Sequence, residues 1–202
     1  ILAKSVWQRK TLPKIVKKTS QNKIEKLSKA KPGKQFRGKL LNFQKEGLDF
    51  LLKSSGNALL ADEMGLGKTV QTLAYIASEK QSLPALVIAP LVTLNNWQAE
   101  INRFMKKKSK NGRIIEDDVP TSTKIRTGKI KDLDNYNFYI INYDLLHKRL
   151  DNLKDLNIRT LVCDEVQHLR SKSTQKYAAV KKLAAMKSVK YRVGLSGTPI
   201  YN

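Results

Sequence analysis

From Phe36 onward, apolar residues gather in short continuous runs that are separated by polar and turn-forming residues. Runs of three to five residues with no polar face predict strands that are buried on both sides. A strand is therefore expected at each of five places, residues 57–61, 85–89, 138–142, 161–163 and 191–195. Pro90 ends the second strand because proline cannot donate a hydrogen bond to the next rung of a sheet.

Between these strands, apolar residues recur at helical spacing. Val70, Leu73, Ala74 and Ala77 occupy one face of a predicted helix. A second helix is expected to run to about Met105, with Thr93 as its N-cap and Leu94, Trp97, Ile101 and Phe104 on one side. Further helices are predicted from the strand at 138–142 through Leu150, and over about 173–187. Alternating strands and helices predict an α/β fold with a mainly parallel sheet covered on both faces.

Residues 106–135 have the weakest pattern of the chain. They contain three consecutive lysines, Lys106–Lys108, an acidic trio and a proline. One edge strand is expected in this stretch, at either 113–116 or 124–127, and the pattern does not decide between them. The lysines are either a patch that faces DNA or a solvated loop.

The charge of the chain is strongly positive and unevenly distributed. The 202 residues include 39 Lys and Arg against 17 Asp and Glu, a formal net charge of +22. Residues 1–39 hold 13 of the basic residues and one acid, Glu25. A positive field of this size favours polyanions, with nucleic acid as the first candidate, although a solvated and flexible lysine-rich segment would look the same. We divide the chain into a basic lead-in, residues 1–35, and a folded domain, residues 36–202.

Several classes of protein are disfavoured by composition. The longest apolar run, residues 85–89, is far shorter than the roughly 20 residues of a membrane-spanning helix. The first residues have no apolar core of a secretory signal, and a single cysteine, Cys163, cannot form an intrachain disulfide. We expect an intracellular domain, in the cytoplasm and nucleoid or in the nucleus according to organism. The absence of an initiator methionine suggests an excerpt from a longer chain.

The segment Asp62–Thr69 lies between a predicted strand and a predicted helix, the setting of a phosphate-binding loop. Gly65 and Gly67 allow backbone N–H groups to turn toward phosphate oxygens, and the following helix N-terminus adds positive potential. Lys68 can reach the β- and γ-phosphates, and the Thr69 hydroxyl can ligate Mg²⁺. The strict pattern has glycine six residues before the lysine, where this chain has Asp62. The residues predicted to bind nucleotide in this loop are Met64, Gly65, Leu66, Gly67, Lys68 and Thr69.

Two adjacent acids, Asp164 and Glu165, end the predicted strand at 161–163. A nucleotide hydrolase needs a carboxylate at a strand end to hold Mg²⁺ and a second one to orient or deprotonate the attacking water. We assign these roles to Asp164 and Glu165 respectively, and the alternative is an exposed acidic turn. Cys163 reads as a small buried hydrophobic residue, Trp97 as a core residue, and His168 as structural or solvent-facing.

Taken in order, these motifs resemble the first RecA-like lobe of a helicase of superfamily two, and specifically of the SWI/SNF-related ATPases. The phosphate loop Asp-Glu-Met-Gly-Leu-Gly-Lys-Thr is characteristic of that family and accounts for Asp62. Leu40–Gly47 resembles the adenine-contacting Q motif, with Gln44 as the reader. Three further segments resemble family motifs, at 89–97, 141–144 and 194–199.

The resemblance implies roles for the residues of these segments. Thr93, Asn96, Asn142 and Tyr143 are the implied contacts to the DNA backbone. Ser196, Gly197 and Thr198 are the implied residues that couple hydrolysis to movement. Gln167 stands where many relatives carry histidine, and its amide can bridge the Glu165 region to Ser196 or Thr198.

The resemblance implies a RecA-like three-layer sandwich of the P-loop NTPase class that binds ATP and Mg²⁺ and uses hydrolysis to move along double-stranded DNA. It also implies a second RecA-like lobe in the same polypeptide, without which this segment is expected to hydrolyse ATP poorly, and protein partners that recruit the motor. A GTPase is excluded by the missing Asn-Lys-x-Asp base reader, and a transporter ATPase by the position of Leu195-Ser196-Gly197 after the acidic pair. The remaining alternative, a catalytically silent scaffold that binds nucleic acid, is disfavoured because Lys68, Thr69, Asp164 and Glu165 are intact.

Overall fold

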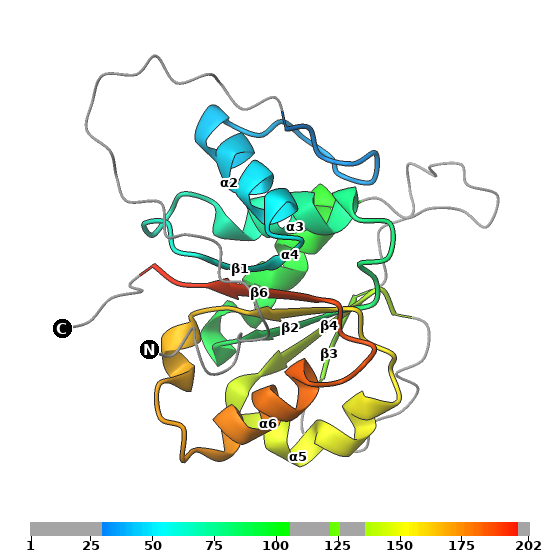
Figure 1. Ribbon diagram of the computed structural model, residues 1–202, viewed down its shortest axis with the longest axis vertical. Coiled ribbons are helices and arrows are strands. Elements are labelled where there is room, and N and C mark those ends of the chain that lie inside the picture. Colours follow the sequence, from blue (N-terminus) through cyan, green and yellow to red (C-terminus); the bar gives the residue numbers. More distant parts are fainter. Residues whose placement is uncertain (1–29, 106–121, 126–135, 198–202) are drawn as a thin grey trace.

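A computed structural model of the chain describes residues 30–105, 122–125 and 136–197. These residues form three layers, with one parallel sheet between two layers of helices (Figure 1). The sheet has six strands in the order β1-β6-β5-β2-β4-β3. The strands are β1 (Asn57–Leu60), β2 (Ala85–Ala89), β3 (Ser122–Lys124), β4 (Phe138–Asn142), β5 (Thr160–Cys163) and β6 (Tyr191–Leu195).

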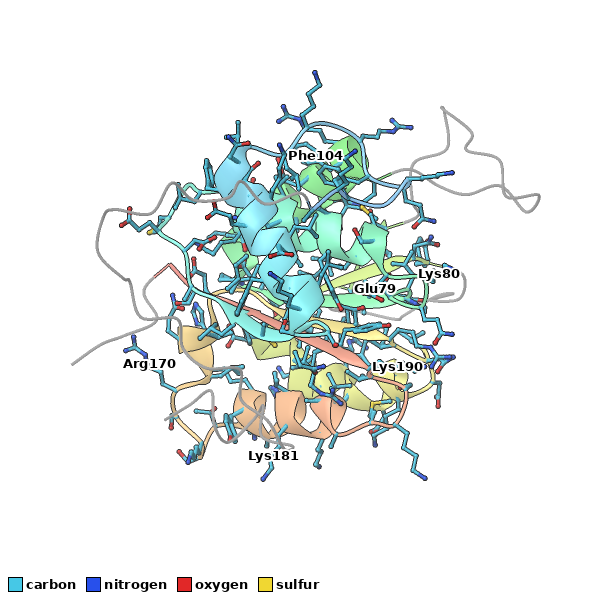
Figure 2. The ribbon with its side chains drawn as sticks, turned by 45° about the horizontal axis from the view of Figure 1, so that its top comes forward. Glu79, Lys80, Phe104, Arg170, Lys181 and Lys190 are labelled. Atoms are coloured by element: carbon cyan, nitrogen blue, oxygen red, sulfur yellow. The ribbon has the colours of Figure 1, made fainter. Side chains whose placement is uncertain are left out.

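Helices cover both faces of the sheet. One layer holds α2 (Asn42–Lys53), α3 (Lys68–Ser78) and α4 (Leu94–Phe104), and the other holds α5 (Tyr143–Lys154) and α6 (Gln175–Ala184) (Figure 1). Polar side chains such as that of Lys181 on α6 point outward from these layers (Figure 2). Two short 3₁₀ turns follow strand ends, at Leu91–Thr93 and Val166–Leu169. None of the helices in the described part of the chain has the length and hydropathy that crossing a membrane requires.

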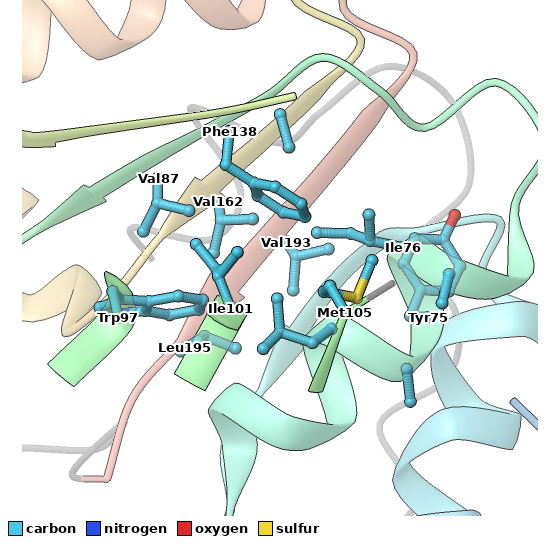
Figure 3. Close-up of a cluster of buried hydrophobic side chains, with 14 of the residues drawn as sticks. Tyr75, Ile76, Val87, Trp97, Ile101, Met105, Phe138, Val162, Val193 and Leu195 are labelled. Carbon is cyan, nitrogen blue, oxygen red and sulfur yellow. The ribbon is translucent and has the colours of Figure 1, made fainter. Parts of the chain in front are cut away.

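Alternate residues of each central strand belong to different halves of the core, as the twofold period of a strand requires. Val87 and Val162 pack in the half that contains Trp97 and Ile101 of α4 (Figure 3). Their neighbours along the chain, such as Leu86, pack in the other half with α5 and α6. Both faces of the sheet are therefore buried by helices, which explains why these strands have no polar face.

The packed region begins before Phe36. The backbone N–H of Gly33 donates to Ser78 Oγ at the end of α3 over 2.9 Å. Phe36 stacks on Phe104 with 5.6 Å between ring centroids, and the N–H of Arg37 donates to the Phe104 carbonyl over 2.7 Å. Gly33, near the end of the proposed lead-in, thus packs against α3, and the first residues of the domain pack against α4.

The predicted strands agree with the structure to within one residue at each end, and the predicted α/β class with a parallel sheet is confirmed. The edge strand is β3, which shares Lys124 with the second of the two alternatives. The predicted helix at 173–187 is shorter, Gln175–Ala184, because Thr174 caps its start by accepting the N–H of Tyr177. The predicted side-chain cap at Thr93 is wrong: the residue lies in a 3₁₀ turn and its hydroxyl donates back to the Pro90 carbonyl over 3.0 Å.

Candidate nucleotide-binding site

All the chemical motifs follow strands, and in a parallel sheet the carboxyl ends of the strands share one edge. The phosphate loop follows β1, Ser196 and Gly197 follow β6, and Asp164 and Glu165 follow β5. Because β6 lies between β1 and β5, the motif latest in sequence sits between the two earlier ones. The sheet order thus gathers residues from three distant parts of the chain into one site.

The phosphate loop closes around the side chain of Lys68. Its Nζ donates to the carbonyls of Asp62, over 2.9 Å, and Glu63, over 3.0 Å. Gly65 and Gly67 have φ values of +85° and +73°, in the left-handed region that favours glycine. A Cβ at Gly65 would meet nothing within 4 Å, so the loop presents bare backbone to open space at this point. A phosphate could approach that backbone closely, as the predicted role requires.

Two glutamines hold the loop from the side of α2 and α3. Gln44 Nε2 donates to the Leu66 carbonyl over 3.5 Å, and a Cβ at Gly67 would lie 2.6 Å from the same nitrogen. The fully buried Gln71 donates from Nε2 to Asp62 Oδ2 over 3.0 Å and to the Leu66 carbonyl over 3.1 Å. The structure therefore brings Gln44 to the phosphate loop, and its contact with adenine stays a prediction. Gln71, which the motif analysis missed, is a structural support of the loop.

Asp164 is held from three sides. Its N–H donates to the Ile88 carbonyl over 2.8 Å and extends the β5–β2 pairing, and its own carbonyl accepts the Tyr143 hydroxyl over 2.6 Å. Its Oδ2 accepts the indole N–H of Trp97 over 2.8 Å. Burial raises the pKa of the Asp164 carboxyl above its ordinary value, and the Trp97 hydrogen bond and the Lys68 charge oppose this shift.

Glu165 begins a hydrogen-bonded chain across the site. Its backbone has φ 49° and ψ 61°, a left-handed conformation that is unfavourable for a residue other than glycine and is found at functional sites. Gln167 Nε2 donates to Glu165 Oε2 over 2.6 Å, and Ser196 Oγ donates to Gln167 Oε1 over 3.1 Å. The bridge from Glu165 to Ser196 that the sequence suggested is present.

Gly197 lies at the centre of the site. A Cβ at this position would be 2.6 Å from Met64 Cγ and 3.7 Å from Lys68 Nζ. A larger residue here would push the exposed side chain of Met64 aside, whereas the backbone N of Met64, at 3.7 Å, would stay in ordinary contact. Thr198, the other predicted coupling residue of this motif, lies outside the described residues.

The predicted DNA contacts fall into two groups. Thr93 is half-buried and Asn96 is exposed at the start of α4, so both present atoms to solvent. Asn142 accepts the N–H of Leu145 over 2.7 Å and caps α5, and Tyr143 is buried with its hydroxyl bound to Asp164. These contacts give Asn142 and Tyr143 structural roles, and all four DNA contacts stay predictions. Lys106–Lys108 lie outside the described residues.

Two predictions about neighbouring side chains are confirmed. Cys163 is fully buried, and burial raises the pKa of its thiol to about 12, as expected for a small residue packed in the core. His168 is exposed and stacks on Tyr143 with 5.3 Å between ring centroids. The imidazole covers the phenol that supports Asp164, which agrees with the structural or solvent-facing position predicted for it.

The donor atoms at this edge suit magnesium shared with a nucleotide. Mg²⁺ prefers carboxylate and hydroxyl oxygens, and it usually takes one or two from the protein and others from phosphates and water. The Asp164 carboxylate and the Thr69 hydroxyl supply this kind of set. Among the described residues, no three His, Cys, Asp or Glu side chains group to form a metal site of their own. The residues present fit a metal that arrives with phosphates.

Several known proteins are similar to this chain in sequence. The SNF2-related domain family matches residues 43–202. The protein YwqA of Bacillus subtilis is 33% identical over 189 residues, which are 88% of this chain and 19% of YwqA. The ISWI chromatin-remodeling complex ATPase ISW1 of Saccharomyces cerevisiae is 30% identical over 172 residues, which are 82% of this chain and 15% of ISW1.

A solved structure agrees with these sequence matches. The Sulfolobus solfataricus SWI2/SNF2 ATPase core, determined in complex with double-stranded DNA, superposes with a TM-score of 0.64 and 30% identity. The match covers 83% of this chain and 34% of that core. The chain therefore spans about a third of the core, and less than a fifth of each of the two curated relatives. On its sequence, its α/β architecture and its motif positions, the chain belongs to the SNF2-related domain family, with a RecA-like fold.

Proposed function

We propose that this chain is the first motor lobe of an ATP-dependent translocase that binds Mg·ATP and couples its hydrolysis to movement on double-stranded DNA. One observation carries the proposal. The sheet order joins Lys68, the acidic pair and the Ser196–Gly197 segment at one edge, and Gln167 links the last two by hydrogen bonds. Such an arrangement suits a site in which the state of the γ-phosphate is relayed to a mobile partner.

Each residue has a defined task in the proposed reaction. Lys68 exchanges its two carbonyl partners for the β- and γ-phosphate oxygens, where its charge offsets the charge that develops in the transition state. Asp164 and Thr69 would hold Mg²⁺, which would neutralise phosphate charge when bound. Glu165 orients the attacking water and accepts its proton. The bond from Gln167 fixes the Glu165 carboxylate in place for this step.

The charge of the chain and its structural relative support double-stranded DNA as the track. The net charge of +22 favours a polyanion, and the similar Sulfolobus core was determined with duplex DNA. Thr93 and Asn96 are the accessible candidates for phosphate contacts at the carboxyl edge of the sheet. That core is about three times as long as the matched part, so we propose that a second RecA-like lobe completes the ATP site. We further propose that the protein acts inside the cell, in the cytoplasm and nucleoid or in the nucleus according to organism, and that protein partners recruit it to DNA.

Movement on DNA is tested directly by displacement of a triplex. A labelled third strand is annealed to a duplex, and the full-length protein is added with Mg·ATP. A translocase displaces the third strand without separating the duplex, and the Glu165→Gln variant should bind ATP and leave the triplex intact. ATP turnover without displacement would refute translocation, and loss of ATP binding in Glu165→Gln would refute the assignment of this residue to the water.

A further inference from the structure

The indole of Trp97 makes a polar contact that its burial does not explain. Trp97 is 1% exposed and points from α4 into the half of the core that also contains Ile101 (Figure 3). Its Nε1 donates to Asp164 Oδ2 over 2.8 Å, across 67 residues of sequence. A phenylalanine would fill most of the same apolar space, so the N–H is the part of this side chain that packing alone leaves unexplained.

The carboxylate that receives this bond also accepts the backbone N–H of Glu165, its neighbour in the chain. The backbone of Asp164 is fixed by Ile88 and by Tyr143, but neither bond reaches the carboxylate. The bond from Trp97 to Oδ2 comes from a different element of the fold, so it is the contact that ties the carboxylate to α4. A hydrogen-bond partner of this kind orients a metal ligand, and its loss typically lowers metal affinity.

Helix α4 carries the predicted DNA contacts on its other side. Thr93 precedes the helix and Asn96 is exposed, whereas Trp97 and Ile101 face the core. Asn96 and Trp97 are adjacent in the first turn of one helix. If DNA displaced this turn, the indole N–H would therefore shift relative to the Asp164 carboxylate.

We propose that Trp97 is a positioning residue that ties helix α4 to the carboxylate of Asp164, so that the DNA-facing turn and the metal ligand move together. This inference rests on the proposed function, because it assigns Asp164 to the metal and α4 to DNA. Trp97 itself touches neither the nucleotide nor the reacting atoms.

The first test measures metal affinity. Full-length protein is titrated with Mn²⁺ in the presence of the non-hydrolysable analogue β,γ-imido-ATP, and free Mn²⁺ is followed by electron paramagnetic resonance. Trp97→Phe keeps an aromatic ring and removes the N–H. It should weaken Mn²⁺ binding about tenfold, the lower end of the range for the loss of a hydrogen-bond partner of a metal ligand. The matched control is Ile101→Val, which trims the same buried face of α4 and has no link to Asp164. Its Mn²⁺ affinity should equal that of the wild type.

A double-mutant cycle shows whether the effect passes through Asp164. Asp164→Asn removes a metal-binding oxygen, so Trp97→Phe should cause no further loss of Mn²⁺ affinity in that background. A loss that adds in full would show that Trp97 acts through general packing and would overturn the inference. Equal losses in Trp97→Phe and Ile101→Val would overturn it in the same way.

The second test measures coupling to DNA. The stimulation of ATP turnover by duplex is compared at saturating metal, where the loss of affinity is compensated. Trp97→Phe should lower the ratio of stimulated to basal turnover severalfold, and Ile101→Val should leave it unchanged. An unchanged ratio in Trp97→Phe would overturn the coupling. If the wild-type protein fails to bind Mn²⁺ with the analogue, the proposed function itself is refuted. If the wild type binds Mn²⁺ and Trp97→Phe binds it equally well, only this inference is overturned.

Discussion

Gly47 lies where α2 packs closest to the buried amide of Gln71. A Cβ at Gly47 would overlap Gln71 Oε1, while Leu60 would stay at an ordinary 3.5 Å. Gln71 is fully buried and holds Asp62 and the Leu66 carbonyl by two hydrogen bonds. Gly47→Ala should therefore drive the Gln71 amide out of its place and loosen the phosphate loop.

The size of the effect follows from three contributions. Overpacking a core costs about 1–3 kcal/mol. The displaced amide loses a neutral hydrogen bond worth about 1 kcal/mol and one to a carboxylate worth about 1.5–3 kcal/mol, parts of which water replaces near the half-exposed loop. Alanine is a better helix former than glycine by about 1 kcal/mol and offsets some of this loss. We expect the free energy of unfolding to fall by about 2–4 kcal/mol.

Urea denaturation of the matched variants measures this quantity. Glu46→Ala, at the exposed neighbouring position of α2, is the control and should change stability by less than about 0.5 kcal/mol. In a Gln71→Ala background the obstacle is gone, so Gly47→Ala should stabilise by up to about 1 kcal/mol. A loss in that background equal to the loss in the wild type would refute the packing argument, as would a neutral Gly47→Ala in the wild type.

Four further outcomes are expected. Lys68→Ala should abolish ATP turnover in the full-length protein and leave the far-ultraviolet circular dichroism unchanged; unchanged turnover would contradict the phosphate-loop assignment. Asp164→Asn should raise the melting temperature of the nucleotide-free protein at neutral pH, because burial raises the pKa of Asp164 and disfavours its charged form. The wild type becomes more stable as pH falls through that raised pKa, so the melting temperatures of the two proteins should converge in acid. A lower melting temperature for Asp164→Asn at neutral pH would contradict a raised pKa of Asp164. Asn142→Ala should cost about 1 kcal/mol in urea denaturation, since it removes the cap of α5; no loss would mean that this bond is not formed in solution. DNA affinity, measured by fluorescence anisotropy, should fall steeply with salt, by about 0.9 log units per log unit of salt for each phosphate contacted, and a flat response would contradict electrostatic binding.

The central strands and the phosphate loop could be predicted because their signals are local. Strands buried on both faces have no polar positions, so β2 and β4 stand out with their ends correct. The glycines and lysine of the phosphate loop act through backbone geometry within eight residues. The edge strand β3 has only three residues, all half-buried and polar, so it lacks both the apolar run and the alternation that identify a strand.

The parts of the site that the sequence did not reveal depend on how elements pack together in the fold. The bond from Trp97 to Asp164 exists because β2, which leads into α4, lies beside β5. Gln71 supports the phosphate loop because α2 and α3 pack closely at Gly47. A buried tryptophan and a helical glutamine are ordinary core residues in sequence, and only the fold shows what their polar atoms meet. Gln167 differs, since its position two residues after Glu165 was itself the signal for the bridge.

We propose that this lobe belongs to a motor that duplex DNA switches on. The most direct measurement is ATP hydrolysis by the full-length protein without DNA, with single-stranded DNA and with duplex DNA, at one salt concentration. Turnover should be low without DNA, and duplex DNA should stimulate it strongly and more than single strands do. Turnover that ignores DNA, or that responds only to single strands or RNA, would contradict the assignment of double-stranded DNA as the track.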